Sequence, residues 1–210
     1  MSDTKSLASK IRERLNANAG TEIAKVFQPG EALQQVDNWI PLKAFFEKGT
    51  GGAKGFAQGH ITQLIGETDS GKTTLMMEGF VSCQSLGGVC YLIDAEHKWS
   101  MERFKLMGGN PDEVIVLQPD YLEQAWDMVG SVLTEIKALR DEGITAPMMI
   151  GYDSLPASVP EKFLGQSASD ANVSVEAKIN NQSVRKYRGA IRATNTAFVV
   201  TNHYYMTVPK

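Results

Sequence analysis

The sequence is poor in cysteine and histidine and has no long hydrophobic run. Its two cysteines, Cys83 and Cys90, form no C-x-x-C pair, and its three histidines have no metal-ligand spacing. This excludes a disulfide framework and favours two buried, free thiols, as in a reducing cytoplasm. No apolar run approaches the roughly 20 residues of a membrane span, and the first residues lack the apolar core of a signal peptide. A net charge of -3 excludes a wholly basic nucleic-acid binder, so any such surface must be local.

The chain of 210 residues is long enough for one sizeable core. Apolar strands alternate with amphipathic helices, which predicts an α/β fold with a parallel sheet and helices on both faces. Strands are expected at residues 61–65, 89–93, 114–117, 148–153 and 196–201, and helices at 73–86, 99–107, 122–142 and 175–194. The first strand is expected to be buried. The first of these helices is expected to turn Leu75, Gly79, Cys83 and Leu86 inward.

Residues 1–30 are expected to form a short helix-strand arm, and residues 31–210 to form the core. Leu7, Ile11 and Leu15 follow helical spacing within residues 4–16, and a strand is expected at residues 22–27. Such an arm either packs on its own domain or docks on a neighbouring subunit. The sequence alone leaves both arrangements open.

The strongest motif lies between the first core strand and its helix, and it fits G-x-x-x-x-G-K-[ST], the P-loop. It consists of Gly66, Glu67, Thr68, Asp69, Ser70, Gly71, Lys72, Thr73 and Thr74. Backbone N–H groups of such a loop bind phosphate oxygens, helped by the helix dipole. Lys72 is expected to contact the β- and γ-phosphates, and the Thr73 hydroxyl to ligate Mg²⁺.

Two acids follow later strands of the predicted sheet. Asp153 ends an apolar strand in the Walker B pattern, where the acid holds Mg²⁺ through water. Glu96 follows the second strand and can orient and deprotonate the water that attacks the γ-phosphate; a solvated loop acid is the alternative. Ligands of open α/β sheets bind at the carboxyl ends of the strands. Glu96, Asp153, Ser154, Asn202 and His203 are therefore expected to converge there.

Together these motifs resemble the core of the RecA family of DNA recombinases, over nearly the whole chain. The specific matches are the P-loop, the segment 91–97 with its Asp-Ala-Glu-His sequence, the segment 152–154 and the strand 195–203. The resemblance implies an ATP-dependent recombinase and DNA-dependent ATPase, with Lys72 and Glu96 as catalytic residues and with ATP and Mg²⁺ bound. It implies filaments on single-stranded DNA that pair with homologous duplex DNA in recombination and repair. It also favours docking of residues 4–27 on a neighbouring subunit.

The sequence departs from the family pattern at three places. His203 stands where bacterial members carry a glutamine that senses the γ-phosphate; histidine there resembles phage recombinases of the UvsX type and suggests a phage source. Arg103 stands where an aromatic residue stacks on adenine, and its guanidinium plane could stack instead. The chain also stops before further strands and basic residues that the family carries. A fragment or a truncated relative, with slow hydrolysis, is therefore expected.

Residues 178–192 contain five basic residues and no acid. By position, Lys178, Asn181 and Arg185 match the DNA-contacting residues of the family, and phosphate contacts supply most sequence-independent affinity. A solvated helix face is the alternative reading of this charge run. The DNA-binding loops are expected at residues 156–174 and from His203 through Tyr204 and Tyr205.

Two other functions share these features. A hexameric helicase-type motor with the RecA fold also carries a P-loop, a glutamate after the second strand and Walker B, and forms a closed ring rather than an open filament. A non-hydrolysing ATP-binding accessory protein would bind recombinase subunits instead. Retention of Lys72 and Glu96 argues against the accessory protein, whereas the missing C-terminal part argues for it.

Overall fold

The computed structural model describes residues 13–14, 17, 38–42, 53–165 and 173–203. The chain divides into two units, residues 1–37 and 38–210. In the first unit only residues 13, 14 and 17 are described, and all three are helical. The rest of the predicted arm, including the strand at residues 22–27, lies outside the described residues. The boundary at residue 30 stays a prediction.

The second unit is built on a five-stranded parallel sheet, as predicted. Its strands are β3 (Ile61–Ile65), β4 (Val89–Asp94), β5 (Val114–Leu117), β6 (Met148–Asp153) and β7 (Thr196–Asn202). Their spatial order is β3-β7-β6-β4-β5. All four pairings are parallel, so the carboxyl ends of the strands lie along one edge.

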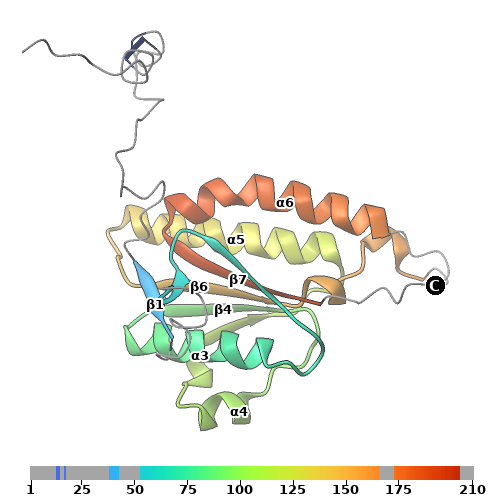
Figure 1. Cartoon of the computed structure of the whole chain (residues 1–210), viewed down its shortest axis with the longest axis horizontal. Coiled ribbons are helices and arrows are strands. Elements are labelled where there is room, and N and C mark those ends of the chain that lie inside the picture. The colour runs from blue at the N-terminus through green and yellow to red at the C-terminus, as the bar shows by residue number, and fades with distance from the viewer. Residues whose placement is uncertain (1–12, 15–16, 18–37, 43–52, 166–172, 204–210) are drawn as a thin grey trace, which may run out of the picture. The chain divides into compact units, whose positions relative to one another are not determined.

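Helices cover both faces of this sheet (Figure 1). One face carries α5 (Leu122–Asp141) and α6 (Val173–Ala193), and the other carries α3 (Lys72–Ser85) with α4 (Met101–Leu106) beyond it. Short 3-10 turns occupy Pro111–Glu113, Leu155–Ala157 and Glu161–Phe163. The last two of these turns lie in the segment after β6 that leads to the predicted helix at residues 175–194. That helix, α6, begins at Val173 instead.

The alternation of side chains along the strands separates two apolar cores. In β4, Tyr91 and Ile93 pack towards α5 and α6, whereas Cys90 and Leu92 pack towards α3 and α4. Successive strand residues point to opposite faces, and both faces are covered, so the whole strand reads as apolar. Cys83 and Cys90 are free and buried, as expected.

Two predictions about burial were wrong. Among the described residues β3 pairs only with β7, so it is an edge strand rather than a buried one, and Ile65 is 58% exposed. Leu86 was expected to face the core but is 49% exposed, because it follows the last residue of α3 and caps that helix. The inward face of α3 is formed instead by Met76, Met77, Gly79, Phe80 and Cys83.

A small antiparallel sheet was not predicted at all. It joins β1 (Trp39–Pro41) to β2 (Gly55–Ala57), with Ile40 opposite Phe56. Both of these side chains are fully buried in the core beneath α3. The glycine-rich approach to β3 therefore includes a strand, which contributes an aromatic side chain to the packing of α3.

Candidate functional site

The loop between β3 and α3 has the backbone geometry that a P-loop requires. A Cβ at Gly66 would lie 2.5 Å from the Ser70 hydroxyl oxygen, and Gly71 adopts a left-handed conformation with φ of 89°. Gly71 is the N-cap residue of α3, and no side-chain hydrogen bond caps the helix there. Uncapped N–H groups and the positive end of a 14-residue helix form an anion-binding site.

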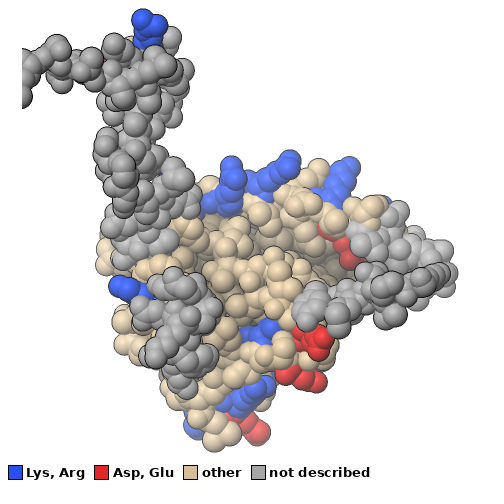
Figure 2. All heavy atoms as spheres, viewed as in Figure 1, with Lys and Arg blue, Asp and Glu red and all other residues tan. Residues whose placement is uncertain are grey.

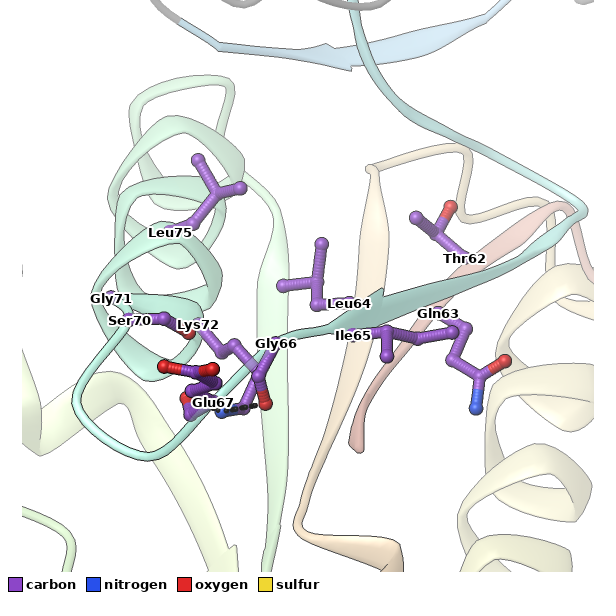
Figure 3. A pocket seen from close by; sticks show the side chains of 10 residues that line it. All are labelled: Thr62, Gln63, Leu64, Ile65, Gly66, Glu67, Ser70, Gly71, Lys72 and Leu75. Atoms are coloured by element: carbon purple, nitrogen blue, oxygen red, sulfur yellow. Dashed lines mark hydrogen bonds between the residues drawn. The ribbon is translucent and has the colours of Figure 1, made fainter. Parts of the chain in front are cut away.

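Lys72 folds back across this loop (Figure 3). Its Nζ donates to the carbonyl oxygens of Gly66 at 3.0 Å and Glu67 at 2.6 Å. The same Nζ lies 3.4 Å from Nδ1 of His203. The register of the sheet explains this last contact, since Ile65 pairs with Asn202 and the end of β7 therefore lies beside the loop.

Two hydroxyl groups hold Asp153 at the end of β6. Thr73 Oγ1 donates to Asp153 Oδ2 at 2.6 Å, and Thr201 Oγ1 donates to Oδ1. A hydroxyl and a carboxylate in contact at the mouth of a P-loop supply the oxygen ligands that Mg²⁺ prefers, with phosphate and water as the others. The described part of the chain contains no group of three or more His, Cys, Asp or Glu side chains that could hold a metal ion.

Glu96 lies on the same edge, after β4. Its Oε1 accepts a hydrogen bond from Ser154 Oγ at 2.7 Å, and its Oε2 accepts one from Lys98 Nζ at 2.9 Å. Nε2 of His203 stands 3.7 Å from Oε1. Burial raises the pKa of Glu96, but the hydrogen bonds from Ser154 and Lys98, the charge of Lys98 and the nearby His203 together outweigh burial, so the pKa is below its ordinary value. The carboxylate is therefore ionised at neutral pH.

His203 thus lies between a lysine and a glutamate. Nδ1 faces Lys72 and Nε2 faces Glu96. Because an ammonium group can only donate, Nδ1 is the acceptor in the first contact. The five side chains expected at the carboxyl edge are brought together there, with the P-loop at one end of the cluster and Glu96 at the other.

Arg103 reaches the P-loop from α4. Its guanidinium group donates to the hydroxyl of Thr74, and the backbone N–H of Arg103 donates to the Ser100 side chain, which caps α4. Phe104, the next residue, is fully buried and packs against Trp99 and Phe80. Arg103 is exposed, whereas Phe104 is buried and Trp99 is partly buried. Of these three residues, Arg103 is therefore the one whose planar group is open to a ligand.

Four of the five basic residues of α6 lie on one exposed face. Lys178, Asn181, Arg185, Arg188 and Arg192 follow each other at intervals of three or four, and all are exposed. We call these five residues the α6 basic face. Figure 2 shows Lys and Arg side chains gathered along α6.

The opposite face of α6 packs on α5, and two of the contacts involve the Trp126 ring. The Trp126 ring stacks on Tyr187 with centroids 6.2 Å apart, and Trp126 Nε1 donates to Asn180 Oδ1 at 2.8 Å. These contacts fix the rotation of α6. The helix therefore keeps its basic face in solvent.

A hollow of 720 Å³ lies beside β3, which is an edge strand among the described residues, and beside α3. Figure 3 shows side chains of β3, the P-loop and α3 around it. Its lining combines the loop and Lys72 with the half-buried Leu64 and Leu75. The loop between β3 and α3 is thus open to solvent on the β3 side.

Sequence reasoning missed two side chains of the site. Thr201 holds Asp153 from the neighbouring strand, and Lys98 holds Glu96 from two residues away. A threonine in an apolar strand and a lysine in a loop carry no pattern that singles them out. The predicted loop at residues 156–174 is described only in part, and Tyr204 and Tyr205 lie outside the described residues.

Comparisons with known proteins agree with this geometry. A model of the RecA N-terminal domain family matches residues 35–209. Protein RecA of Sulfurimonas denitrificans is 32% identical over 193 residues, which are 89% of this chain and 53% of that relative. The chain therefore spans about half the length of the relative it matches. Among the described residues no helix is long and apolar enough to cross a membrane.

Proposed function

This chain belongs to the RecA family, and on that premise we propose that it is the ATP-hydrolysing core of a DNA recombinase. It binds ATP and Mg²⁺ at the P-loop, binds single-stranded DNA through the α6 basic face, and assembles into filaments that pair the strand with homologous duplex DNA. A cytoplasmic location is part of the proposal, since both thiols are free.

One observation carries the proposal. The ionised Glu96 is held by Ser154 at 2.7 Å on the same sheet edge as Lys72 and the pair of Thr73 and Asp153. This edge thus combines a cation for phosphate, oxygen ligands for a divalent cation, and a base of fixed orientation. Phosphoryl transfer to water requires these three groups.

The roles follow from the atoms present. Residues 66–74 surround the phosphates through backbone N–H groups, and Lys72 turns from its two carbonyl contacts towards the β- and γ-phosphates. Glu96 orients water and takes its proton. Mg²⁺, held by Thr73 and Asp153, would offset phosphate charge. His203 contacts the terminal phosphate from between Lys72 and Glu96, and Arg103 lies against the nucleotide beside Thr74.

The DNA-binding part of the proposal rests on the α6 basic face. Lys178, Asn181 and Arg185 span two turns of helix, and each is exposed. A cationic stripe on an acidic protein suits a phosphate backbone without base specificity. β7 ends at Asn202, and the chain continues through His203 into the segment proposed as the second DNA loop. The residue proposed to contact the γ-phosphate is therefore directly connected along the main chain to a proposed DNA-binding loop.

The test is ATP hydrolysis with and without single-stranded DNA. We expect turnover that rises with DNA in the unmodified protein and is lost in Lys72→Ala. Lys137→Ala is the matched control, because Lys137 is exposed and pairs with Asp141 on α5, at 2.6 Å. DNA binding without nucleotide turnover would contradict the ATPase assignment, and turnover that never responds to DNA would contradict the recombinase assignment.

Assembly distinguishes this function from a ring-shaped motor. We expect electron microscopy with ATP and single-stranded DNA to show open helical filaments. Closed rings, together with unwinding of a forked duplex, would instead indicate a helicase-type motor. The same images would test whether residues 1–30 act as the docking arm, since their deletion should abolish filaments while leaving nucleotide binding intact.

A further inference from the structure

Lys98 provides a second cation beside the proposed base. Its Nζ contacts Oε2 of Glu96 at 2.9 Å, whereas Ser154 and His203 face Oε1. The two carboxylate oxygens therefore have different environments. The Glu96 side chain is 23% exposed and the Lys98 side chain is 77% exposed, so the ammonium group is on the solvent side of the carboxylate.

The main chain that carries Lys98 is firmly held. The buried carboxylate of Asp94 accepts from the backbone N–H of Lys98 at 3.1 Å and of Trp99 at 3.2 Å, and from Gln118 at 3.1 Å. The residues at 95 and 96 both donate to the carbonyl oxygen of Asp153. The backbone of Lys98 is thus fixed to β4 and β6, while its long side chain is 77% exposed.

Lys98 lies among carboxylates and is a permanent cation. Its hydrogen bond to Glu96 raises its pKa, and the charges of Glu96, Asp153 and Asp69 raise it further. Asp153 and Asp69 belong to the proposed metal site and to the P-loop, so Lys98 responds to charges on both sides of the place where phosphates would lie. Lys72, His203, Glu96 and Lys98 form a continuous series of contacts along this edge.

The contact between Lys98 and Glu96 also makes Glu96 less effective as a general base. It lowers the pKa of Glu96, and a carboxylate of lower pKa is a weaker base. A carboxylate that approaches a phosphate is in addition repelled by it. Both effects are relieved when the ammonium group moves from the carboxylate to the phosphate, because it then attracts the phosphate and leaves Glu96 free to accept a proton.

We propose that Lys98 is a catalytic residue within the same chain. When ATP binds, its side chain moves so that the ammonium group leaves Glu96 and contacts a terminal phosphate oxygen. In the hydrolytic step the water oxygen bonds to the γ-phosphorus, and the bridging oxygen leaves with its electron pair on ADP. The proton of the water goes to Glu96, and Lys98 stays protonated throughout. This inference rests on the proposed ATPase function.

The first test compares binding of two nucleotides, ADP and the slowly hydrolysed ATPγS, each with Mg²⁺. Lys98→Met should weaken ATPγS binding about tenfold relative to ADP and slow single-turnover hydrolysis at least as much. Removal of one buried, preorganised donor costs roughly 10²–10³ in rate, and the exposure of Lys98 reduces the expected effect. Lys98→Arg should retain most of both. Lys137→Met, which breaks an exposed ion pair on α5, should change neither.

A second background separates contact with phosphate from an effect through Glu96. In Glu96→Gln, the change Lys98→Met should still weaken ATPγS relative to ADP. Disappearance of that effect would overturn the proposal, because Lys98 would then act only by pairing with the carboxylate. Equal losses for ADP and ATPγS, or none for either, would also overturn it.

The binding ratio also separates this proposal from the ATPase assignment. A wild-type protein that binds both nucleotides without turnover would refute the ATPase assignment and the catalytic step of Lys98 alike, and the binding ratio would still show whether Lys98 contacts the phosphate. Turnover with no effect of Lys98→Met would refute the role of Lys98 alone. A wild-type protein that binds neither nucleotide would refute both.

Discussion

Two glycines inside helices allow a sharp test of how α3 packs against the sheet. Gly79 lies on the buried side of α3, and Gly189 lies on the exposed side of α6. A Cβ at Gly79 would stand 2.5 Å from Cε2 of Phe56 and 2.9 Å from Cε of Met149, and both of those side chains are fully buried. A Cβ at Gly189 would meet no atom within 4 Å.

The same substitution should therefore have different effects on the free energy of unfolding at the two positions. Gly→Ala in a helix interior stabilises by about 1 kcal/mol through backbone entropy and solvation, and this contribution is common to both variants. Adding a methyl group to a filled core typically costs about 1–3 kcal/mol. Gly189→Ala should therefore raise the free energy of unfolding by about 1 kcal/mol. Gly79→Ala should leave it unchanged or lower it by up to about 2 kcal/mol.

Urea unfolding followed by circular dichroism measures this difference. The midpoints should separate while the m values stay equal, since neither change alters the surface exposed on unfolding. The reasoning would be refuted by equal stabilisation of the two variants. That result would mean that Phe56 of β2 does not pack beneath α3 in solution. A fall in m for Gly79→Ala alone would show instead that the change alters the unfolded or native ensemble.

Three further predictions concern the site and the surface. Ser154→Ala removes a hydrogen bond that lowers the pKa of Glu96, so that pKa should rise and the acid limb of the profile of kcat/KM against pH should move to higher pH. Arg185→Ala should weaken single-stranded DNA binding at low salt and reduce the slope of log K against log salt by about 0.7; an unchanged slope would remove this residue from the interface. Cys83 and Cys90 should resist a thiol reagent until the protein unfolds, because both are buried and because the neighbouring Cys83 thiol and burial raise the pKa of Cys90; rapid labelling of the native protein would contradict the packing of α3 on β4.

Elements with a strong local pattern were predictable. The apolar run of β4 and the helical spacing of Val129, Val132 and Ile136 in α5 each depend on neighbours along the chain, and the structure confirms both. β1 and β2 carry no such pattern, because each has three residues and is defined by its partner. Pro41 ends the first of them, as is typical of an edge position. Their existence depends on a pairing between segments that are distant in sequence.

The position of β3 in the sheet could not be inferred from its residues either. Ile61, Leu64 and Ile65 make the segment look like a buried strand, yet the strand order places it at the edge. Strand order is a property of the connections, which place β7 rather than β4 beside β3 although β4 follows β3 in sequence. An apolar residue at a sheet edge costs little free energy of folding where a helix partly covers it. Leu64 is half-buried and lines the same hollow as Leu75 of α3.

The sequence predicts which strand ends meet at the site but not which side chains are in contact there. The carboxyl ends of parallel strands meet at one edge, so the convergence of Asp153 and His203 with the P-loop could be expected from the order of the elements. Which side chains touch is decided by register. Tyr152 pairs with Val200, which brings Thr201 beside Asp153, and a shift of one residue in β7 would turn that hydroxyl to the other face of the sheet. No local pattern in β7 specifies this register; the packing of Phe198 and Val200 against α5 and α6 does, and it thereby also positions His203 beside Lys72.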